Sequence, residues 1–290
     1  MENYPIGWVE KNTGISKETL RKWEERYGFP KPSRDRKGNR FYLMDQIALI
    51  ARVGHLTNQG VPVSRAINAI LTGDRVGNVP GVSGAFPEKA LKALSGSDAE
   101  ALKEAMLEEL RLNGLASLVV DSLPGLNESV GGKWANGEIS LYQEHLYTEV
   151  VQQVLRQAIP GVSSGLPLFA LLATPPGELH ALGILMVQSL CAVGEKRTIS
   201  LGSQVPIADL SKAVEELNPF ALGLSFSSSY PKRSIGKFLA ELRDRIQPST
   251  EIWIGGLGAQ RASRLPVGIK RFRSISDFDG YLKETRSSLG

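Results

Sequence analysis

Glu178 and His180 stand two positions apart, directly after an apolar run, and are the residues best suited to chemistry in this chain. A neutral imidazole is a good ligand for a transition metal, and a nearby carboxylate can orient the ring. Gly183 follows where a helix is expected to begin. The pattern indicates metal ligation by one histidine, although a lone pattern of this kind is also typical of an ordinary loop histidine.

Two further signals follow at set distances from this histidine. Between Gly183 and Ser225-Phe226-Ser227 lie 41 residues, and between Ser227 and Gly255-Gly256 lie 27 residues. Secondary structure must bridge both spacings, so three parts in register are more specific than any one of them. Together they resemble the cobalamin-binding motif, although Ser227 stands where that motif often has leucine.

The resemblance implies a role for each residue. His180 would ligate cobalt from below in place of the cofactor's own base, and Glu178 would orient the imidazole or its loop. Ser225 and Ser227 would offer hydroxyl groups to the displaced nucleotide tail. Glycine leaves room beside the sheet for that tail, and the residues concerned are Gly183, Gly255 and Gly256. Taken alone, the glycine pair would be a plain tight turn.

The region from residue 166 onward alternates apolar runs with helical patterns, which predicts a parallel, doubly wound sheet of flavodoxin type. The expected strands are Leu168–Ala173, Thr198–Leu201, Ala221–Ser225, Ile252–Ile254 and Ile269–Phe272. The expected helices are Leu179–Val193, Pro206–Asn218, Lys232–Arg245 and Leu257–Ser263. Ligands bind such sheets at the carboxyl ends of the strands. We therefore expect His180, Ser225 and Gly255 to converge.

The positive charge of the chain is concentrated near its N-terminus. Residues 1–74 hold 12 Lys and Arg against 8 Asp and Glu, whereas the remaining 216 residues hold 22 of each. The whole excess of +4 therefore lies in this segment, which favours a polyanionic partner.

The basic segment has a helix-turn-helix pattern. Helices are expected at Ile6–Asn12 and Lys17–Tyr27, with a turn between them and Ser16 as the N-cap of the second helix. A hairpin with Gly38-Asn39 at its tip suits a wing lying on phosphates. Two more helices are expected, at Asp45–Asn58 and Val63–Leu71.

This segment resembles the MerR family of winged-helix regulators. The resemblance lies in Thr19–Glu24, the wing from Arg34 to Tyr42, and the tract from Gly60 to Ser64. It implies binding to double-stranded DNA, with phosphate contacts that position the domain. The expected DNA-binding residues are Lys17, Arg21, Lys22, Arg34, Arg36, Lys37, Arg40 and Tyr42. Tyr42 is expected to serve mainly as a core residue, and the alternative for the segment is a basic helical domain with no DNA role.

The middle of the chain is predicted to be helical. Residues 75–86 are rich in glycine and small residues and are expected to form a linker. Helices are expected at 87–95, 98–112, 114–132 and 138–158, which together suit a small bundle. The predicted division is a DNA-binding domain at 1–74, this linker, a four-helix bundle at 87–163 and a flavodoxin-like domain at 164–290.

Nine residues separate Trp134 from Glu144-His145, and Trp134 is expected in the connection before the last helix. This spacing resembles the CarH/LitR photoreceptor regulators, whose bundle caps the upper face of adenosylcobalamin. It implies that Trp134 packs over the adenosyl group and that Glu144 and His145 lie near its ribose and adenine. The alternative is a core tryptophan with an unrelated Glu-His pair on a solvated helix face. Light-sensing relatives carry a histidine after this tryptophan, but here the residue is Ala135, which cannot ligate cobalt.

Composition restricts the remaining possibilities. Cys191 is the only cysteine and there are three histidines, so an internal disulfide and a cysteine-based zinc or iron–sulfur site are excluded. No apolar run approaches the length of a membrane span, and no signal peptide pattern is present, so we expect a cytoplasmic protein. No nucleophile or general acid–base constellation is present, so we expect no enzyme activity.

The resemblances cover nearly the whole chain and imply a cobalamin-dependent, light-responsive transcriptional repressor. With adenosylcobalamin in the dark it would form a tetramer on operator DNA, and light would release the DNA. One alternative is a regulator that responds to another corrinoid or to a different signal, without light sensing. An alternative of another class is a corrinoid carrier for a methyltransferase, which the basic winged helix argues against.

Overall fold

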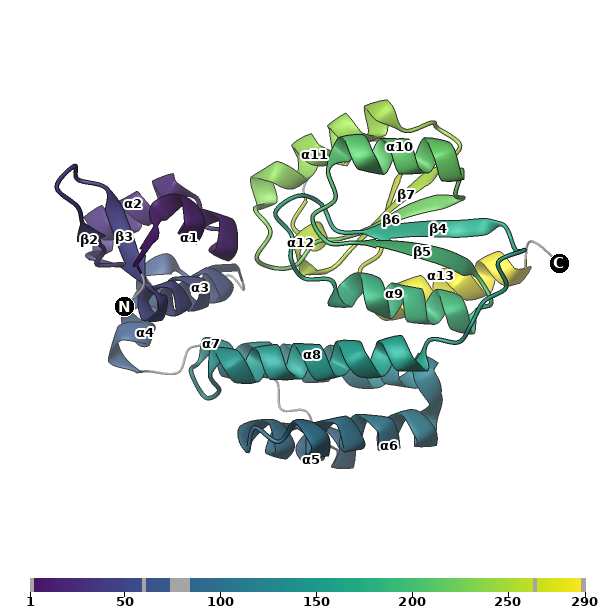
Figure 1. Cartoon of the computed structure of the whole chain (residues 1–290), viewed down its shortest axis with the longest axis horizontal. Helices are drawn as coiled ribbons and strands as arrows, with labels where there is room; N and C mark the ends of the chain where they lie inside the picture. The colour runs from purple at the N-terminus through teal and green to yellow at the C-terminus, as the bar shows by residue number, and fades with distance from the viewer. Residues whose placement is uncertain (1–2, 59–60, 74–83, 263–264, 288–290) are drawn as a thin grey trace. The chain divides into compact units, whose positions relative to one another are not determined.

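The computed structural model describes residues 3–58, 61–73, 84–262 and 265–287 (Figure 1). Contacts group the chain into two compact units. The first comprises Met1–Pro80 and Ser129–Glu144, and the second comprises Gly81–Glu128 and His145–Gly290. The grouping of 129–144 with the N-terminal part is not a feature that the sequence predicts. Most of the expected linker, residues 74–83, lies outside the described residues.

The N-terminal unit is a helix-turn-helix with a small antiparallel sheet. Its elements are β1 (Asn3–Pro5), α1 (Ile6–Thr13), α2 (Lys17–Tyr27), β2 (Ser33–Arg34), β3 (Arg40–Leu43), α3 (Met44–Asn58) and α4 (Val63–Thr72), with sheet order β1-β3-β2. The predicted cap is confirmed, because the hydroxyl of Ser16 accepts a hydrogen bond from the amide of Thr19 at 3.1 Å. Gly14 and Gly28 end α1 and α2 in the left-handed conformation, which glycine adopts without a steric penalty.

The core of this unit is formed mainly by apolar residues of the four helices. Its fully buried members include Val9, Leu20, Ile50 and Val53. Ala135, which is 1% exposed, belongs to the same cluster although it follows these residues by more than 80 positions. The predicted turn of the helix-turn-helix is thus held by a core that a distant segment helps to fill.

The helical middle of the chain consists of α5 (Ala85–Ser95), α6 (Ala99–Ser117), the π-helical turn η1 (Leu118–Ser122), α7 (Leu123–Ala135) and α8 (Leu141–Ala158). Gly114 interrupts α6 with φ 80° and ψ 168°, where the sequence predicted a break. The carboxylate of Asp98 caps α6 by accepting from the amide of Ala101 at 2.9 Å. Trp134 lies in the last turn of α7 and not in a connection, so that part of the prediction is wrong.

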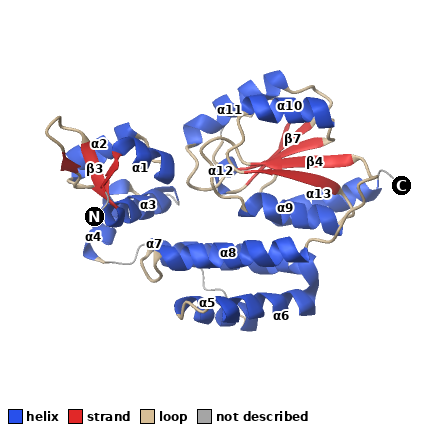
Figure 2. Ribbon diagram, in the orientation of Figure 1, coloured by secondary structure: helices blue, strands red, loops and turns tan. Residues whose placement is uncertain are grey.

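The C-terminal part is a five-stranded parallel sheet between two layers of helices (Figure 2). Its strands are β4 (Leu168–Ala173), β5 (Arg197–Gly202), β6 (Ala221–Ser225), β7 (Glu251–Gly255) and β8 (Ile269–Arg271), in the order β5-β4-β6-β7-β8. Helices α10 (Ile207–Leu217) and α11 (Lys232–Arg245) cover one face. Helices α9 (Leu182–Val193) and α13 (Ile275–Ser287) cover the other. This strand order confirms the predicted flavodoxin-type fold.

The sheet positions its site through strand register. Strand β6 lies between β4 and β7, and Ser225 pairs with Gly255 at the carboxyl ends of their strands. The short helix α12 (Leu257–Gln260) follows immediately. No helix among the described residues is both long enough and apolar enough to span a bilayer.

Candidate functional site

The loop after β4 carries the predicted metal ligand. A turn closes with a hydrogen bond from the amide of Glu178 to the oxygen of Pro175 at 3.0 Å, and Gly177 within it has φ 84°. Helix α9 begins only at Leu182. His180 therefore lies in a loop and not within a helix as expected, while Gly183 is in the first turn of α9.

The carboxylate of Glu178 joins the first motif to the second. Its Oε1 accepts from the amide of His180 at 2.9 Å and lies 2.6 Å from Nδ1 of the His180 ring. Its Oε2 accepts from the amide of Ser227 at 2.8 Å. One side chain, itself 1% exposed as a residue, thereby fixes the loop after β4 against the end of β6.

This carboxylate is held in its charged form. Burial by itself raises the pKa of Glu178, but the hydrogen bonds and charge from His180 and the amide of Ser227 outweigh it and leave the pKa below its ordinary value. Tyr230 responds to the same charge, because burial and Glu178 raise the pKa of its phenol to about 12. The site therefore contains a buried anion next to an imidazole.

The ring of His180 is presented outward by this arrangement. Its side chain is 59% exposed, while Nδ1 is bound to Glu178. A carboxylate bound at one ring nitrogen fixes the tautomer and raises the basicity of the other nitrogen, as in carboxylate–histidine–metal sites. Nε2 is thus the atom through which His180 can ligate a metal.

Two of the three predicted glycines, Gly183 and Gly256, pack where no side chain fits, whereas a Cβ on Gly255 would meet nothing within 4 Å. A Cβ on Gly183 would lie 2.4 Å from Oγ of Ser225, and a Cβ on Gly256 would lie 2.4 Å from the main-chain oxygen of Phe226. Gly256 also has φ 87°, which only glycine adopts readily. The three motifs meet at the carboxyl ends of β4, β6 and β7, as predicted, whereas their roles toward a cofactor stay predictions.

Thr174 supports this site and was missed by the sequence reasoning. Its fully buried hydroxyl donates to the main-chain oxygen of Glu178 at 2.6 Å and accepts from the amide of Gln204 at 3.0 Å. The hydroxyl thereby joins the Glu178 loop to the loop after β5. A threonine between a fully apolar strand and a Pro-Pro-Gly turn was the available signal.

The DNA-binding candidates on α2 differ in whether they form an ion pair with a nearby glutamate. Lys17 pairs with Glu10 at 3.4 Å, and Lys22 pairs with Glu18 at 2.6 Å. Arg21 is exposed and carries no ion pair within the described part of the chain. Arg21 is therefore, of these three basic side chains of α2, the one most available to bind a phosphate.

Glu24 of α2 holds the wing through two arginines. Its carboxylate lies 2.5 Å from an Nη of Arg34 and 2.5 Å from Nε of Arg40. Burial raises the pKa of Glu24, but the hydrogen bonds from Arg40 and Arg34 outweigh it and leave the pKa below its usual value. The wing is thus fixed to the predicted recognition helix before any DNA is bound.

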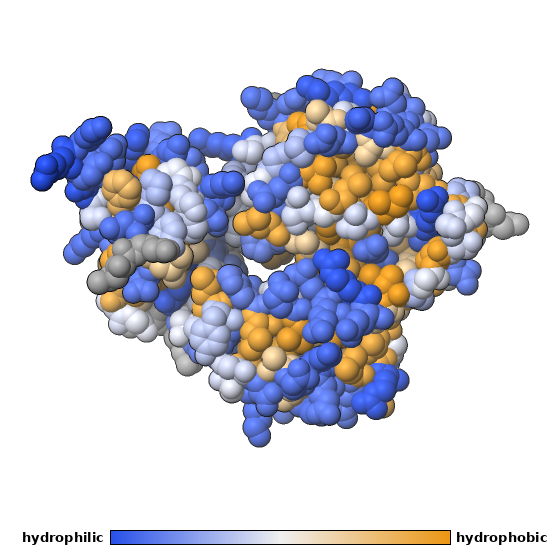
Figure 3. Space-filling model, viewed as in Figure 1, coloured by the Kyte–Doolittle hydropathy of each residue, from blue (hydrophilic) through white to orange (hydrophobic). Residues whose placement is uncertain are grey.

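The tip of the wing is built by Asp35. Its carboxylate accepts from the amides of Lys37 at 2.9 Å and Asn39 at 2.8 Å, and from the side chain of Asn39 at 2.8 Å. Arg36 and Lys37 are exposed there and have no ion pair among the described residues. The surface of this unit is predominantly hydrophilic in Figure 3.

A hollow of about 310 Å³ lies between the wing and the helix-turn-helix. It is lined by Pro5, Ile6, Arg21, Gly38, Asn39, Arg40 and Phe41. Two of the lining residues, Arg21 and Arg40, are predicted DNA contacts. Tyr42 is 0% exposed and belongs to the core. Its expected core role is confirmed, and it does not reach the surface that a DNA contact would require.

The residues expected over the cofactor fall in two helices. Trp134 ends α7, and Glu144 and His145 lie in the first turns of α8. Trp134 packs edge-on against His55 of α3, with ring centroids 5.6 Å apart at 83°. His55 of the DNA-binding region thus contacts a predicted site residue.

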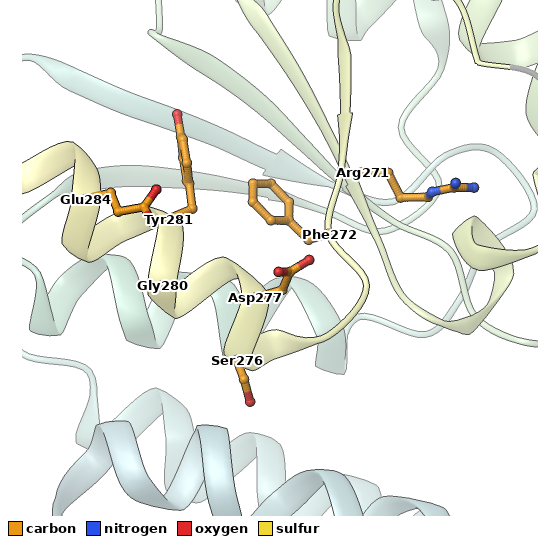
Figure 4. A pocket seen from close by; sticks show the side chains of 7 residues that line it. All are labelled: Arg271, Phe272, Ser276, Asp277, Gly280, Tyr281 and Glu284. Carbon is orange, nitrogen blue, oxygen red and sulfur yellow. The ribbon is translucent and has the colours of Figure 1, made fainter.

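A second hollow, of about 300 Å³, lies beside α13 (Figure 4). It is lined by Arg271, Phe272, Ser276, Asp277, Gly280, Tyr281 and Glu284. None of the predicted site residues belongs to it, and Arg271 is bound to the main-chain oxygens of Ala259 and Ala262. This hollow is therefore separate from the candidate site.

Comparisons with known protein families match the N-terminal and the middle segments of the chain. The model for the MerR HTH family regulatory protein matches residues 4–71, and that for a B12 binding domain matches residues 87–159. The chain is 27% identical over 297 aligned residues to the HTH-type transcriptional repressor CarH of Myxococcus xanthus, covering 95% of this chain and 97% of CarH. It is also 27% identical over 261 residues to the repressor CarA of that organism, covering 88% and 87%.

A solved structure shares the fold. The monomethylamine corrinoid protein of Methanosarcina barkeri aligns with a TM-score of 0.55 at 14% identity, covering 69% of this chain and 98% of that protein. The fold and the matched segments define a MerR-type helix-turn-helix regulator that carries a B12-binding domain. Within this class the chain is similar over most of its length to the repressors CarH and CarA.

Proposed function

We propose that this protein is a cobalamin-dependent transcriptional repressor that holds adenosylcobalamin and responds to light. The observation that carries the proposal is the Glu178 carboxylate, which binds Nδ1 of His180 and the amide of Ser227 together. The donor set fits a corrin cobalt, which takes one imidazole from the protein below the metal. The repressor activity of CarH and CarA supports the regulatory part.

Each residue of the site has a task toward the cofactor. His180 would ligate through Nε2, and Glu178 would keep Nδ1 protonated and the ring directed outward. Ser225 and Ser227 would offer hydroxyls to the nucleotide tail, and Gly183, Gly255 and Gly256 would line its path. Bound adenosylcobalamin would supply a cobalt–carbon bond that light can break.

The upper face is assigned to the helical part of the chain. Trp134 would provide a flat apolar wall, and Glu144 and His145 would bind the adenosyl group's polar atoms. Ala135 cannot replace a ligating histidine, and its side chain is buried in the core of the N-terminal unit. We therefore propose light sensing without capture of cobalt by the residue after Trp134.

DNA recognition follows from the basic surface of the winged helix. Lys17, Arg21, Lys22, Arg34, Arg36, Lys37 and Arg40 would contact operator phosphates, with one or two side chains of α2 reaching base edges. The cofactor would stabilise a DNA-competent assembly, a tetramer, more than the free subunits. Several winged helices in one assembly would then amplify the difference in affinity. We place this regulator in the cytoplasm and assign it no catalytic step.

One experiment tests the proposal. The protein is loaded with adenosylcobalamin in the dark, and a DNA sequence is selected with it from a random library. Absorption, oligomer size and DNA affinity are then measured before and after green light. We expect retention of the cofactor, an assembly larger than the monomer, and loss of DNA binding on illumination. Failure to retain any corrinoid would refute the proposal.

The remaining outcomes separate the alternatives. Retention with no change on illumination would favour a regulator of the same class that answers to another signal. Retention without selection of any DNA would favour a corrinoid carrier. His180→Ala should release the corrinoid while circular dichroism stays unchanged, and unchanged retention would overturn the ligand assignment.

A further inference from the structure

The end of helix α7 is seated on helix α3 of the DNA-binding region. The edge-on contact between Trp134 and His55 places the indole against this helix. Gly131, one turn earlier in α7, faces the same ring, because a Cβ there would lie 3.4 Å from Cε1 of His55. The contact therefore extends over a full turn of α7.

A second contact fixes the last residue of α7. Nε of Arg52, also in α3, donates to the main-chain oxygen of Ala135 at 3.1 Å. Carbonyl groups at the C-terminal end of a helix carry partial negative charge and favour a cation. Burial lowers the pKa of Arg52, so the guanidinium is withdrawn from water at this contact. Gly137 passes so close that a Cβ would lie 2.6 Å from an Nη of Arg52.

Apolar packing completes the contact. Ala135 is 1% exposed and shares the core cluster of the N-terminal unit with Ile50 and Val53 of α3. A cation–carbonyl bond, an aromatic pair and a buried methyl group thus hold one short segment on one helix. We call Arg52, His55, Trp134 and Ala135 the α3–α7 joint.

The joint lies where the two units are continuous through their helices. Helix α7 runs from Leu123 in the second unit to Ala135 in the first, and α8 runs from Leu141 in the first to Ala158 in the second. Each is a hydrogen-bonded rod over its length. Helix α7 thus belongs to both units, and its last turn contacts α3.

We propose that Arg52 and His55 are positioning residues that couple the state of the cofactor site to the DNA-binding helices through Trp134. The inference rests on the proposed function, in which Trp134 faces the cofactor. Trp134 is then shared, because its ring makes a T-shaped contact with His55 and would also contact the cofactor. Coupling of this kind is reciprocal, so cofactor binding must change the stability of α3, and loosening α3 must change Trp134.

The test is hydrogen exchange of the full-length protein, measured by mass spectrometry with and without adenosylcobalamin in the dark. In the wild type, we expect the cofactor to change exchange of the amides in Met44–Asn58 by about fivefold or more, the lower range of measured couplings. In Arg52→Ala and His55→Ala, this change should fall below about twofold. Absorption of the retained corrinoid reports cofactor binding independently.

Matched variants separate coupling from loss of structure. His55→Phe keeps an aromatic edge against Trp134 and should restore the cofactor-dependent change. Arg65→Ala removes an exposed arginine from α4 of the same unit and should leave that change at the wild-type size. A variant that merely loosened the fold would raise exchange equally in both states and would not remove the difference between them.

The outcomes are distinct. Retained corrinoid with no change in α3 of the wild type, or an undiminished change in both alanine variants, would overturn the coupling and leave the proposed function standing. An absence of retained corrinoid in the wild type would refute the proposed function, and the coupling with it.

Discussion

The carboxylate of Glu178 accepts a hydrogen bond from the amide of Ser227, 49 residues further along the chain, at 2.8 Å. The bond connects the loop after β4 with the end of β6, which are adjacent strands. Its other oxygen holds the ring of His180. The orientation of the imidazole thus depends on a strand that does not carry it.

Replacement of Glu178 by glutamine should weaken cofactor affinity by about 10- to 100-fold, the usual effect of losing a partner of a metal-bound histidine. The amide nitrogen of glutamine is a donor, so only one oxygen would remain to accept from the three N–H groups that the carboxylate now serves. Equilibrium dialysis against adenosylcobalamin in the dark measures the change. Glu216→Gln, on the exposed face of α10, is the matched control, and equal affinities of the two variants would contradict the prediction.

The same carboxylate should make stability depend on pH. The pKa of Glu178 in the folded state lies below its ordinary value of 4.5. Its ionised form therefore contributes its full stabilisation at pH values above the pKa of this group in the unfolded chain. The contribution is lost as pH falls through the folded-state pKa. Urea unfolding of wild type and Glu178→Gln should therefore differ at pH 7 and converge in the acidic range below 4.5. A difference that stays constant down to that range would refute the assignment.

Gly256→Ala should destabilise the protein by about 1–3 kcal/mol, because it combines backbone strain with a steric conflict. The added Cβ would meet the main-chain oxygen of Phe226, which cannot rotate away. Gly183→Ala should cost less, since the hydroxyl of Ser225 can change rotamer. Thermal unfolding compares both with Gly161→Ala, where nothing lies within 4 Å of the added carbon. Equal costs at the three positions would contradict the argument.

Arg36→Ala and Lys37→Ala should each weaken DNA binding to all sequences and reduce the salt slope of log K by about 1. Both side chains stand at the exposed tip of the wing and have no ion pair within the described residues. Affinity is measured by fluorescence anisotropy between low and moderate salt. Lys237→Ala, exposed on α11, removes the same kind of charge elsewhere, and a similar loss there would indicate a nonspecific charge effect.

The sequence predicted best those elements that have a strongly periodic apolar pattern or are stabilised mainly by local interactions. The bounds of α2, α11, β4 and β6 agree with the structure because their apolar spacing is clear. Helix α13 was missed because its sequence offers little beyond Phe278 and Leu282 as a buried face. It is held by tertiary contacts, among them the Phe278–Trp253 ring pair at 5.4 Å.

The candidate site shows the same division. Its three motifs could be placed at adjacent strand ends from spacing alone, since parallel strands share one carboxyl edge. The role of Thr174 could not be predicted, because its hydroxyl binds the amide of Gln204 in the loop after β5, whereas Thr174 itself follows β4. In the sequence, Ala135 indicated only that a cobalt ligand is absent at this position. Its place in the core of the N-terminal unit could not be predicted, because that core is formed mostly by residues more than 60 positions earlier.

The buried side chain of Ala135 limits how the winged helix of such a regulator can be exchanged for that of another protein. A winged helix that could be exchanged freely between proteins would carry all of its own core. Here one core residue is supplied by the far end of α7. A fragment ending before α5 would carry a small hole and an uncovered apolar surface, and a foreign winged helix would need a matching α3. Exchange of the winged helix therefore requires that the end of α7 be exchanged with it or fitted to it.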